Sequence, residues 1–168
     1  MAGKMMIAAT VAALALAGCA NKPKRLPPVA DGTPGGNGSV TDPNGGIILG
    51  THQDFIRSVM SDRVFFDTDR YNIDSEDMAA LQSQAQWLAR YPNTRATIEG
   101  HCDERGTRDY NLALGERRAN AAKNALVSMG VNPARVTTVS YGKERPDALG
   151  SDAESWARNR RAVTVTVR

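Results

Sequence analysis

From about residue 51 onward, the hydrophobic positions of the chain follow helical and strand spacings in turn. One apolar stripe, with steps of three and four residues, predicts a helix that Asp74 or Ser75 caps and that ends before Pro92. A second helix is predicted over about residues 109–129, with Gly130 as its C-terminal cap. The first stripe is Met78, Leu81, Ala85 and Leu88, and the expected inward face of the second helix is Leu112, Ala119, Ala122, Leu126 and Met129.

Runs rich in β-branched and aromatic residues predict the strands. They cover residues 63–66, 96–99, 136–141 and 162–167, and shorter helices are predicted over 54–60 and 152–159. The last run alternates valine and threonine, which indicates a half-buried strand. The resulting β-α-β-α-β-α-β order with one-sided helices predicts an α+β two-layer sandwich, with the helices on one face of a four-stranded mixed sheet.

The segment before this domain has a different composition. Residues 19–50 are rich in glycine and proline, contain no aromatic residue and have few apolar residues. Such a segment cannot bury enough surface to offset its chain entropy, so we expect a flexible tether. The predicted organisation is a signal peptide over 1–18, a lipidated N-terminus and tether over 19–50, and one folded domain over 51–168.

The N-terminus has the features of an export signal. Lys4 precedes an apolar run, Met5 to Ala17, and small residues follow it. The sequence Leu16-Ala17-Gly18-Cys19 resembles the lipobox of bacterial lipoproteins, which implies cleavage before Cys19 and acylation of its thiol. A transmembrane anchor is the alternative, but a span needs about 20 apolar residues. Ala20, where an inner-membrane retention signal would have Asp, favours the outer membrane, with the domain in the periplasm.

Composition narrows the possible functions. A formal net charge of +3 on 168 residues is too small a basic excess to indicate a nucleic-acid partner. The chain has two cysteines, so lipidation of Cys19 would leave Cys102 unpaired and no disulfide framework. We expect Cys102 to be a small packing residue or a buried free thiol.

The densest group of reactive and charged side chains runs from Gly100 to Thr107, where a predicted strand ends. Loops at strand ends commonly carry function. A carboxylate in this run can accept a hydrogen bond from an ammonium group, and a guanidinium in the run or on the following helix can bind a carboxylate through two parallel hydrogen bonds. Brought together, the two side chains would recognise the free end of an amino acid.

These residues resemble a known family. The matching motif is Gly100-His101-Cys102-Asp103, Gly106, Tyr110-Asn111, Leu114 and Arg118-Ala119. It is similar to the signature of the OmpA-like peptidoglycan-binding domains, and the runs 64–71, 141–144 and 159–163 are similar to those of the Tol–Pal lipoproteins that carry this domain. The family often has Thr where Cys102 stands, so one hydroxyl hydrogen bond is missing here.

The resemblance implies a function without catalysis and without a cofactor. It implies non-covalent binding of the peptide stem of peptidoglycan at meso-diaminopimelate, with Asp103 on the ammonium and Arg118 on the carboxylate. It also implies TolB and the other Tol proteins as partners, in a system that serves envelope integrity and cell division. The remaining site residues that it implies are Asp69, Asn111, Leu114 and the backbone of Gly100 and His101.

The same residues allow other interpretations. Asp103 and Arg118 could form a surface salt bridge, and His101, Cys102 and Asp103 could suggest a wall hydrolase. Adjacent residues of an extended segment point to opposite faces, which argues against a catalytic triad. Zinc-ligand spacings are absent from the sequence. A wall-binding lipoprotein outside the Tol system stays open as an alternative.

Overall fold

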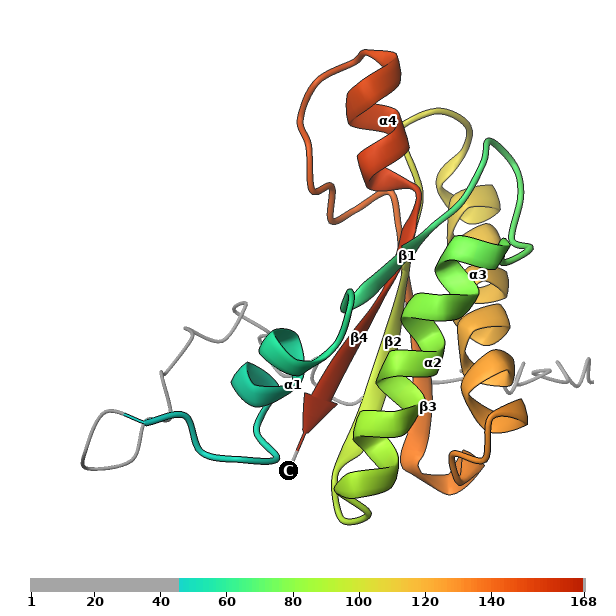
Figure 1. Ribbon diagram of the computed structural model, residues 1–168. Coiled ribbons are helices and arrows are strands. Elements are labelled where there is room, and N and C mark those ends of the chain that lie inside the picture. The colour runs from blue at the N-terminus through green and yellow to red at the C-terminus, as the bar shows by residue number, and fades with distance from the viewer. Residues whose placement is uncertain (1–45, 168) are drawn as a thin grey trace, which may run out of the picture. The chain divides into compact units, whose positions relative to one another are not determined.

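The computed structural model describes residues 46–167 (Figure 1). The predicted signal peptide, the predicted lipidation site Cys19 and nearly all of the predicted tether lie outside the described residues. Of the described helices, none is long and apolar enough to cross a bilayer.

The described chain forms a four-stranded sheet with helices, in the order that the sequence predicts. The elements are α1 (His52–Ser58), β1 (Arg63–Phe65), α2 (Ser75–Arg90), β2 (Arg95–His101), α3 (Arg108–Ser128), a 3₁₀ turn (Pro133–Arg135), β3 (Val136–Gly142), α4 (Ala153–Asn159) and β4 (Arg161–Val167). The strand order is β1-β4-β2-β3, with β2 and β3 parallel and the other pairs antiparallel. Helices α2 and α3 pack side by side on one face of the sheet (Figure 1). The α+β fold is therefore confirmed.

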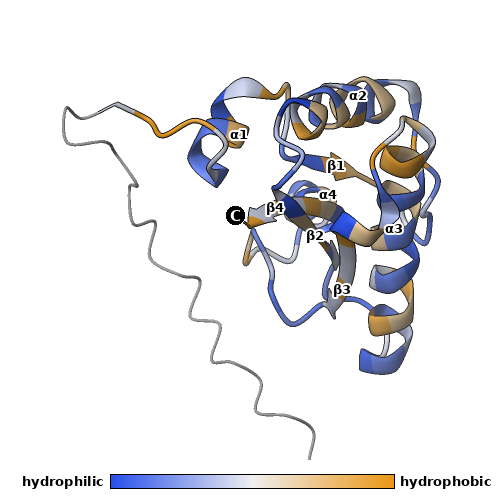
Figure 2. Cartoon of the chain, turned by 90° about the horizontal axis from the view of Figure 1, so that it is seen from below, coloured by the Kyte–Doolittle hydropathy of each residue, from blue (hydrophilic) through white to orange (hydrophobic). Residues whose placement is uncertain are grey.

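The helix ends follow local sequence rules. The Asp74 side chain accepts the backbone N–H of Asp77 and caps α2, and Thr107 caps α3 in the same way. Gly130 ends α3 with a φ of +95°, the left-handed conformation that favours glycine. Figure 2 shows hydrophobic residues interspersed with hydrophilic ones along α2 and α3.

The predicted inward face of α2 is wrong at its first position. Met78 is 40% exposed, and Asp77 is buried in its place. The Asp77 carboxylate accepts the backbone N–H of Phe65, with its two oxygens at 3.1 and 3.2 Å. This N–H lies on the side of β1 that faces away from β4. The buried carboxylate thus gives a backbone N–H of the edge strand β1 a hydrogen-bond acceptor, which an apolar side chain could not provide. In α3, Leu112 and Met129 are only half-buried, and Leu114 and Arg118 are buried.

In β4 the threonines, not the valines, face the helices. Thr164 and Thr166 are 2% and 6% exposed, whereas Val163 and Val165 are half-buried on the opposite face. The Thr164 hydroxyl donates to Oε1 of Gln84 at 2.8 Å, and both side chains are buried. The core therefore contains a polar pair that is satisfied by its own hydrogen bond.

Two glycines bring α3 close to the end of β2. A Cβ on Gly100 would overlap the carbonyl of Gly115, and a Cβ on Gly115 would lie 2.9 Å from the Gly100 oxygen. Only glycine at both positions allows this backbone contact. The contact sets the first half of α3 beside the loop that follows β2.

Candidate functional site

A cavity of about 460 Å³ lies where β2 ends and α3 begins. Its lining residues are Thr68, Asp69, Cys102, Asp103, Arg105, Gly106, Thr107, Tyr110, Asn111, Leu114, Arg118 and Arg160. Five side chains expected from the sequence are therefore in one place: Asp69, Asp103, Asn111, Leu114 and Arg118.

Gly100 and His101, also expected at the site, do not line the cavity. Gly100 contacts α3 instead. The His101 ring lies tilted against the Tyr141 ring, and its Nε2 is 3.6 Å from the Glu99 carboxylate. The backbone of His101 nevertheless contributes, because its carbonyl accepts a hydrogen bond from Nη1 of Arg118 at 2.8 Å.

Asp103 is held by two arginines. Its Oδ2 accepts Nη2 of Arg105 at 2.7 Å and Nη1 of Arg160 at 3.4 Å, and its Oδ1 accepts Nε of Arg105 at 3.1 Å. Burial by itself would raise the pKa of the Asp103 carboxyl, but the hydrogen bonds and charge of Arg105 hold that pKa below its ordinary value. The carboxylate is therefore ionised at neutral pH, although its residue is only 7% exposed.

Arg118 forms the floor of the cavity and joins three chain segments. Its Nε, Nη1 and Nη2 donate to the carbonyls of Arg70, His101 and Asp67 at 2.9, 2.8 and 3.1 Å. The residue is 0% exposed, and burial lowers the pKa of its guanidinium. Arg118 does not pair with Asp103, so both charges border the same cavity as separate groups.

The Asp69 side of the cavity has an unusual backbone conformation. Asp69 has a φ of +56°, the one positive value among the non-glycine residues that the structure describes. Its Oδ1 accepts the hydroxyl of Tyr110 at 3.1 Å, which bridges the 66–74 loop and α3. Sparsely populated backbone conformations of this kind cluster at functional sites.

The loop over residues 101–107 is fixed by hydrogen bonds from its surroundings. Nδ2 of Asn111 donates to the carbonyls of Arg105 and Thr107 at 2.7 and 3.0 Å, and Nζ of Lys143 donates to those of Glu104 and Gly106. Cys102 is buried and free, and burial raises the pKa of its thiol. The prediction of a buried free thiol is confirmed.

The sequence did not single out Arg105 as a side chain that holds the site residue Asp103. Arg105 also stacks on Trp156 at 4.3 Å from the ring centroid, and Trp156 Nε1 donates to Glu104 at 3.0 Å. The charged lining therefore consists of two carboxylates and three guanidiniums. This excess of positive charge favours a ligand with at least one carboxylate. Within residues 46–167, no group of three or more metal-ligating side chains is present.

The comparison with protein families agrees with this geometry. The model of the OmpA family matches residues 65–160, a range that includes the whole cavity lining and strands β2 and β3. The chain belongs to the OmpA family.

Sequence similarity to individual proteins extends beyond residues 65–160. The peptidoglycan-associated lipoprotein of Rhizobium meliloti (strain 1021) is 55% identical over 157 residues, 94% of this chain and 84% of that protein. The crystal structure of the peptidoglycan-associated lipoprotein from Burkholderia pseudomallei superposes with a TM-score of 0.64 at 45% identity, over 68% of this chain and all of that one. The C-terminal domain of Helicobacter pylori MotB, at 22% identity and a TM-score of 0.60, covers 64% of this chain and 84% of that domain, and shows the fold alone.

Proposed function

We propose that this protein is an outer-membrane lipoprotein that holds the membrane to the cell wall by binding the diaminopimelate-containing stem of peptidoglycan. The observation that carries the proposal is the meeting of Asp103 and Arg118 at one cavity without pairing to each other. A carboxylate and a guanidinium left separate in this way are complementary to the amine and carboxylate at the end of a diaminopimelate side chain.

The geometry suggests how the ligand enters. The Arg105 side chain is 42% exposed and covers Asp103, so it must turn aside for an ammonium group to reach the carboxylate. Arg118 uses three of its five N–H groups on carbonyls and also interacts with the Cys102 thiol, so in this proposal its remaining N–H group meets the ligand carboxylate. In this proposal Asp69, Asn111 and Leu114 shape the wall, and the His101 carbonyl positions Arg118.

The chain's N-terminal features complete the proposal. Acylation of Cys19 would anchor the protein in the outer membrane, and the tether would let the domain search for stems in the periplasm. Binding at one stem need not be tight, because a millimolar complex requires only about 4 kcal/mol. Many anchored copies facing a repeating lattice gain strength through effective concentration.

The experiment that tests the site is sedimentation of the full chain with purified sacculi. Asp103→Asn keeps the shape of the side chain and removes its charge, and we expect it to reduce the bound fraction at least fivefold. The matched control is Asp109→Asn, an exposed carboxylate on α3 outside the cavity lining, which should bind like the wild type. Free meso-diaminopimelate should compete, and cadaverine, which carries amines but no carboxylate, should not.

The outcomes separate the alternatives. Equal sedimentation of Asp103→Asn and wild type, with both proteins folded by circular dichroism, would refute the site. Release of soluble wall fragments would indicate a hydrolase. Co-purification with TolB would support a place in the Tol system. If the two proteins do not co-purify from cells that contain both, a wall-binding lipoprotein outside that system is favoured.

A further inference from the structure

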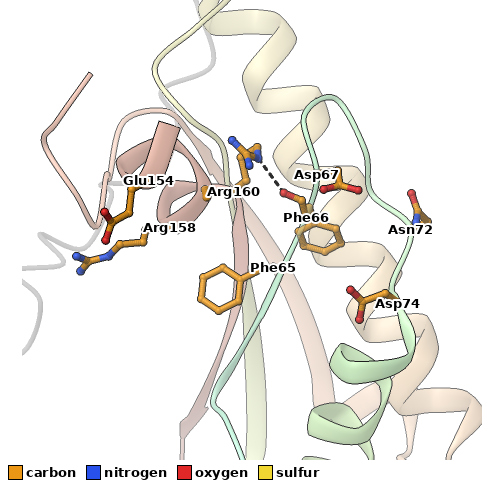
Figure 3. Close-up of a pocket in the computed structure, with 9 residues that line it drawn as sticks. Phe65, Phe66, Asp67, Asn72, Asp74, Glu154, Arg158 and Arg160 are labelled. Atoms are coloured by element: carbon orange, nitrogen blue, oxygen red, sulfur yellow. Dashed lines mark hydrogen bonds between the residues drawn. The ribbon is translucent and has the colours of Figure 1, made fainter. Parts of the chain in front are cut away.

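A second cavity, of about 340 Å³, lies between the end of β1 and helix α4 (Figure 3). Its lining residues are Phe65, Phe66, Asp67, Asn72, Asp74, Glu154, Ala157, Arg158 and Arg160. The Phe65 ring is 45% exposed and lies between two charged walls, with Asp67 and Asp74 on one side and Glu154 and Arg158 on the other (Figure 3). The wall-binding proposal does not use this surface.

The positive charges of this second cavity already have partners. Nε of Arg160 donates to the Phe66 carbonyl at 2.8 Å, and its Nη1 reaches Asp103. Arg158 forms an ion pair with Asp147 at 3.1 Å.

The carboxylates are available. Within residues 46–167, the side chains of Asp67 and Glu154 make neither an ion pair of 4 Å or less nor a side-chain hydrogen bond, and Asp74 uses one oxygen to cap α2. The unpaired charge of the cavity is therefore negative.

We infer that this second cavity is a docking site for a segment of a partner protein that presents an apolar or aromatic side chain flanked by lysine or arginine. The apolar side chain would pack on the Phe65 ring, and the flanking cations would reach Asp67 on one wall and Glu154 on the other. Charge complementarity and the exposed Phe65 ring favour this occupant, because a diaminopimelate stem of the cell wall offers a single ammonium group and no aromatic side chain between two cations. The inference goes beyond the wall-binding proposal and does not depend on it.

The two cavities share one chain segment. The Phe66 carbonyl accepts Arg160, and the Asp67 carbonyl accepts Arg118, both of which line the first cavity. A partner that shifts this segment would move two arginines of the first cavity. If the wall-binding proposal holds, occupation of either cavity should change the affinity of the other by the same factor.

The experiment is an NMR titration of the ¹⁵N-labelled full chain with the peptide acetyl-Gly-Lys-Phe-Lys-Gly-amide. A contact of this size predicts a Kd on the order of 1 mM, within reach of chemical-shift titration. We expect the amide signals of residues 65–74 and 153–158 to move. The same peptide with glutamate for lysine, and the one with glycine for phenylalanine, should each bind at least fivefold more weakly.

Variants test the contacts directly. Asp67→Asn combined with Glu154→Gln should weaken the lysine peptide at least fivefold, whereas Glu116→Gln, an exposed carboxylate on α3, should leave its affinity unchanged. Equal affinity of the wild-type protein for the lysine and glutamate peptides would overturn the inference. So would equal affinity of the double variant and the wild type for the lysine peptide. The NMR spectra themselves show whether the variants are folded.

Other occupants would also be visible. Movement of the same signals by soluble muropeptides would assign the second cavity to the wall and overturn a protein partner. Movement of these signals in the unliganded chain when Lys22, Lys24 and Arg25 are replaced by glutamine would assign it to the chain's own N-terminal segment. Movement on dilution alone would assign it to a second copy of the chain.

Discussion

Gly100 on β2 and Gly115 on α3 meet backbone to backbone, with no room for a side chain on either residue. The contact joins the strand that leads into the Asp103 loop to the helix that carries Arg118. It therefore sets the spacing of the two charges that border the first cavity.

Gly100→Ala should lower the free energy of unfolding by about 3 kcal/mol, because the atom opposite the new methyl is backbone that cannot turn away. Urea denaturation measures the change. The control is Gly130→Ala, where a Cβ meets nothing within 4 Å and only the φ of +95° is unfavourable. That control should lose about 1 kcal/mol. Equal losses in the two variants would show that the close contact has no special weight.

Thr164→Val should destabilise the protein by about 1–3 kcal/mol even though valine is more hydrophobic. The substitution leaves Oε1 of Gln84 buried without the donor that now reaches it at 2.8 Å. Val165→Thr, the reverse change on the half-buried opposite face, should cost less than about 1 kcal/mol. Chemical denaturation of both variants tests the assignment of faces. A stabilised Thr164→Val would contradict it.

Arg105→Gln should make wall binding more sensitive to acid. The Arg105 guanidinium holds the pKa of the Asp103 carboxyl below its ordinary value, and without it burial raises that pKa. A carboxyl with a lowered pKa stays ionised as pH falls, so wild-type binding should persist to a lower pH than binding by the variant. Sedimentation with the same sacculi between pH 7 and pH 3 compares the two curves. If the wild type and Arg105→Gln lose binding at the same pH, the result would count against the role of Asp103 as the ammonium acceptor.

Asp77→Asn should change how stability depends on pH. Burial, with Asp74 and Glu76 nearby, raises the pKa of the Asp77 carboxyl from 3.8 to about 6 against the opposing hydrogen bond from Phe65. The unfolded chain ionises this group more easily, so its contribution to wild-type stability decreases as pH rises from about 4 to 6. After allowance for solvent screening, the variant should gain roughly 1 kcal/mol relative to wild type between pH 4 and pH 7.

Urea denaturation at the two pH values measures this gain. Asparagine is chosen because its side-chain oxygen can still accept the Phe65 N–H, so the substitution removes only the titration. Asp109→Asn, an exposed carboxylate, is the control and should follow the wild type. Parallel stability profiles of wild type and Asp77→Asn would show that Asp77 titrates normally.

Much of the architecture follows from local patterns. The order of helices and strands, the Asp74 cap, the Gly130 end of α3 and the one-sided covering of the sheet were predicted from periodicity and capping residues, and each is confirmed. Such features depend on neighbours along the chain. The inward position of Met78 was wrong because the deciding group, the Phe65 N–H, belongs to another element.

The site divides in the same way. Family resemblance named Asp103 and Arg118, and the match of the OmpA family to residues 65–160 confirms that membership. Sequence spacing did not reveal that Arg105 and Arg160 hold the carboxylate of Asp103, since Arg160 is 57 residues away along the chain. Nor did it show that Arg118 donates to three backbone carbonyls.

The sequence by itself determined the elements, their order and the residue types available at the end of β2, because these depend on short-range periodicity, caps and turns. Only the tertiary structure decided which face of β4 is buried, which charges share a cavity and which carboxylates are left unpaired beside α4. Those outcomes depend on hydrogen bonds and packing between segments that are distant in the chain, and each polar group that is buried must find its partner among them.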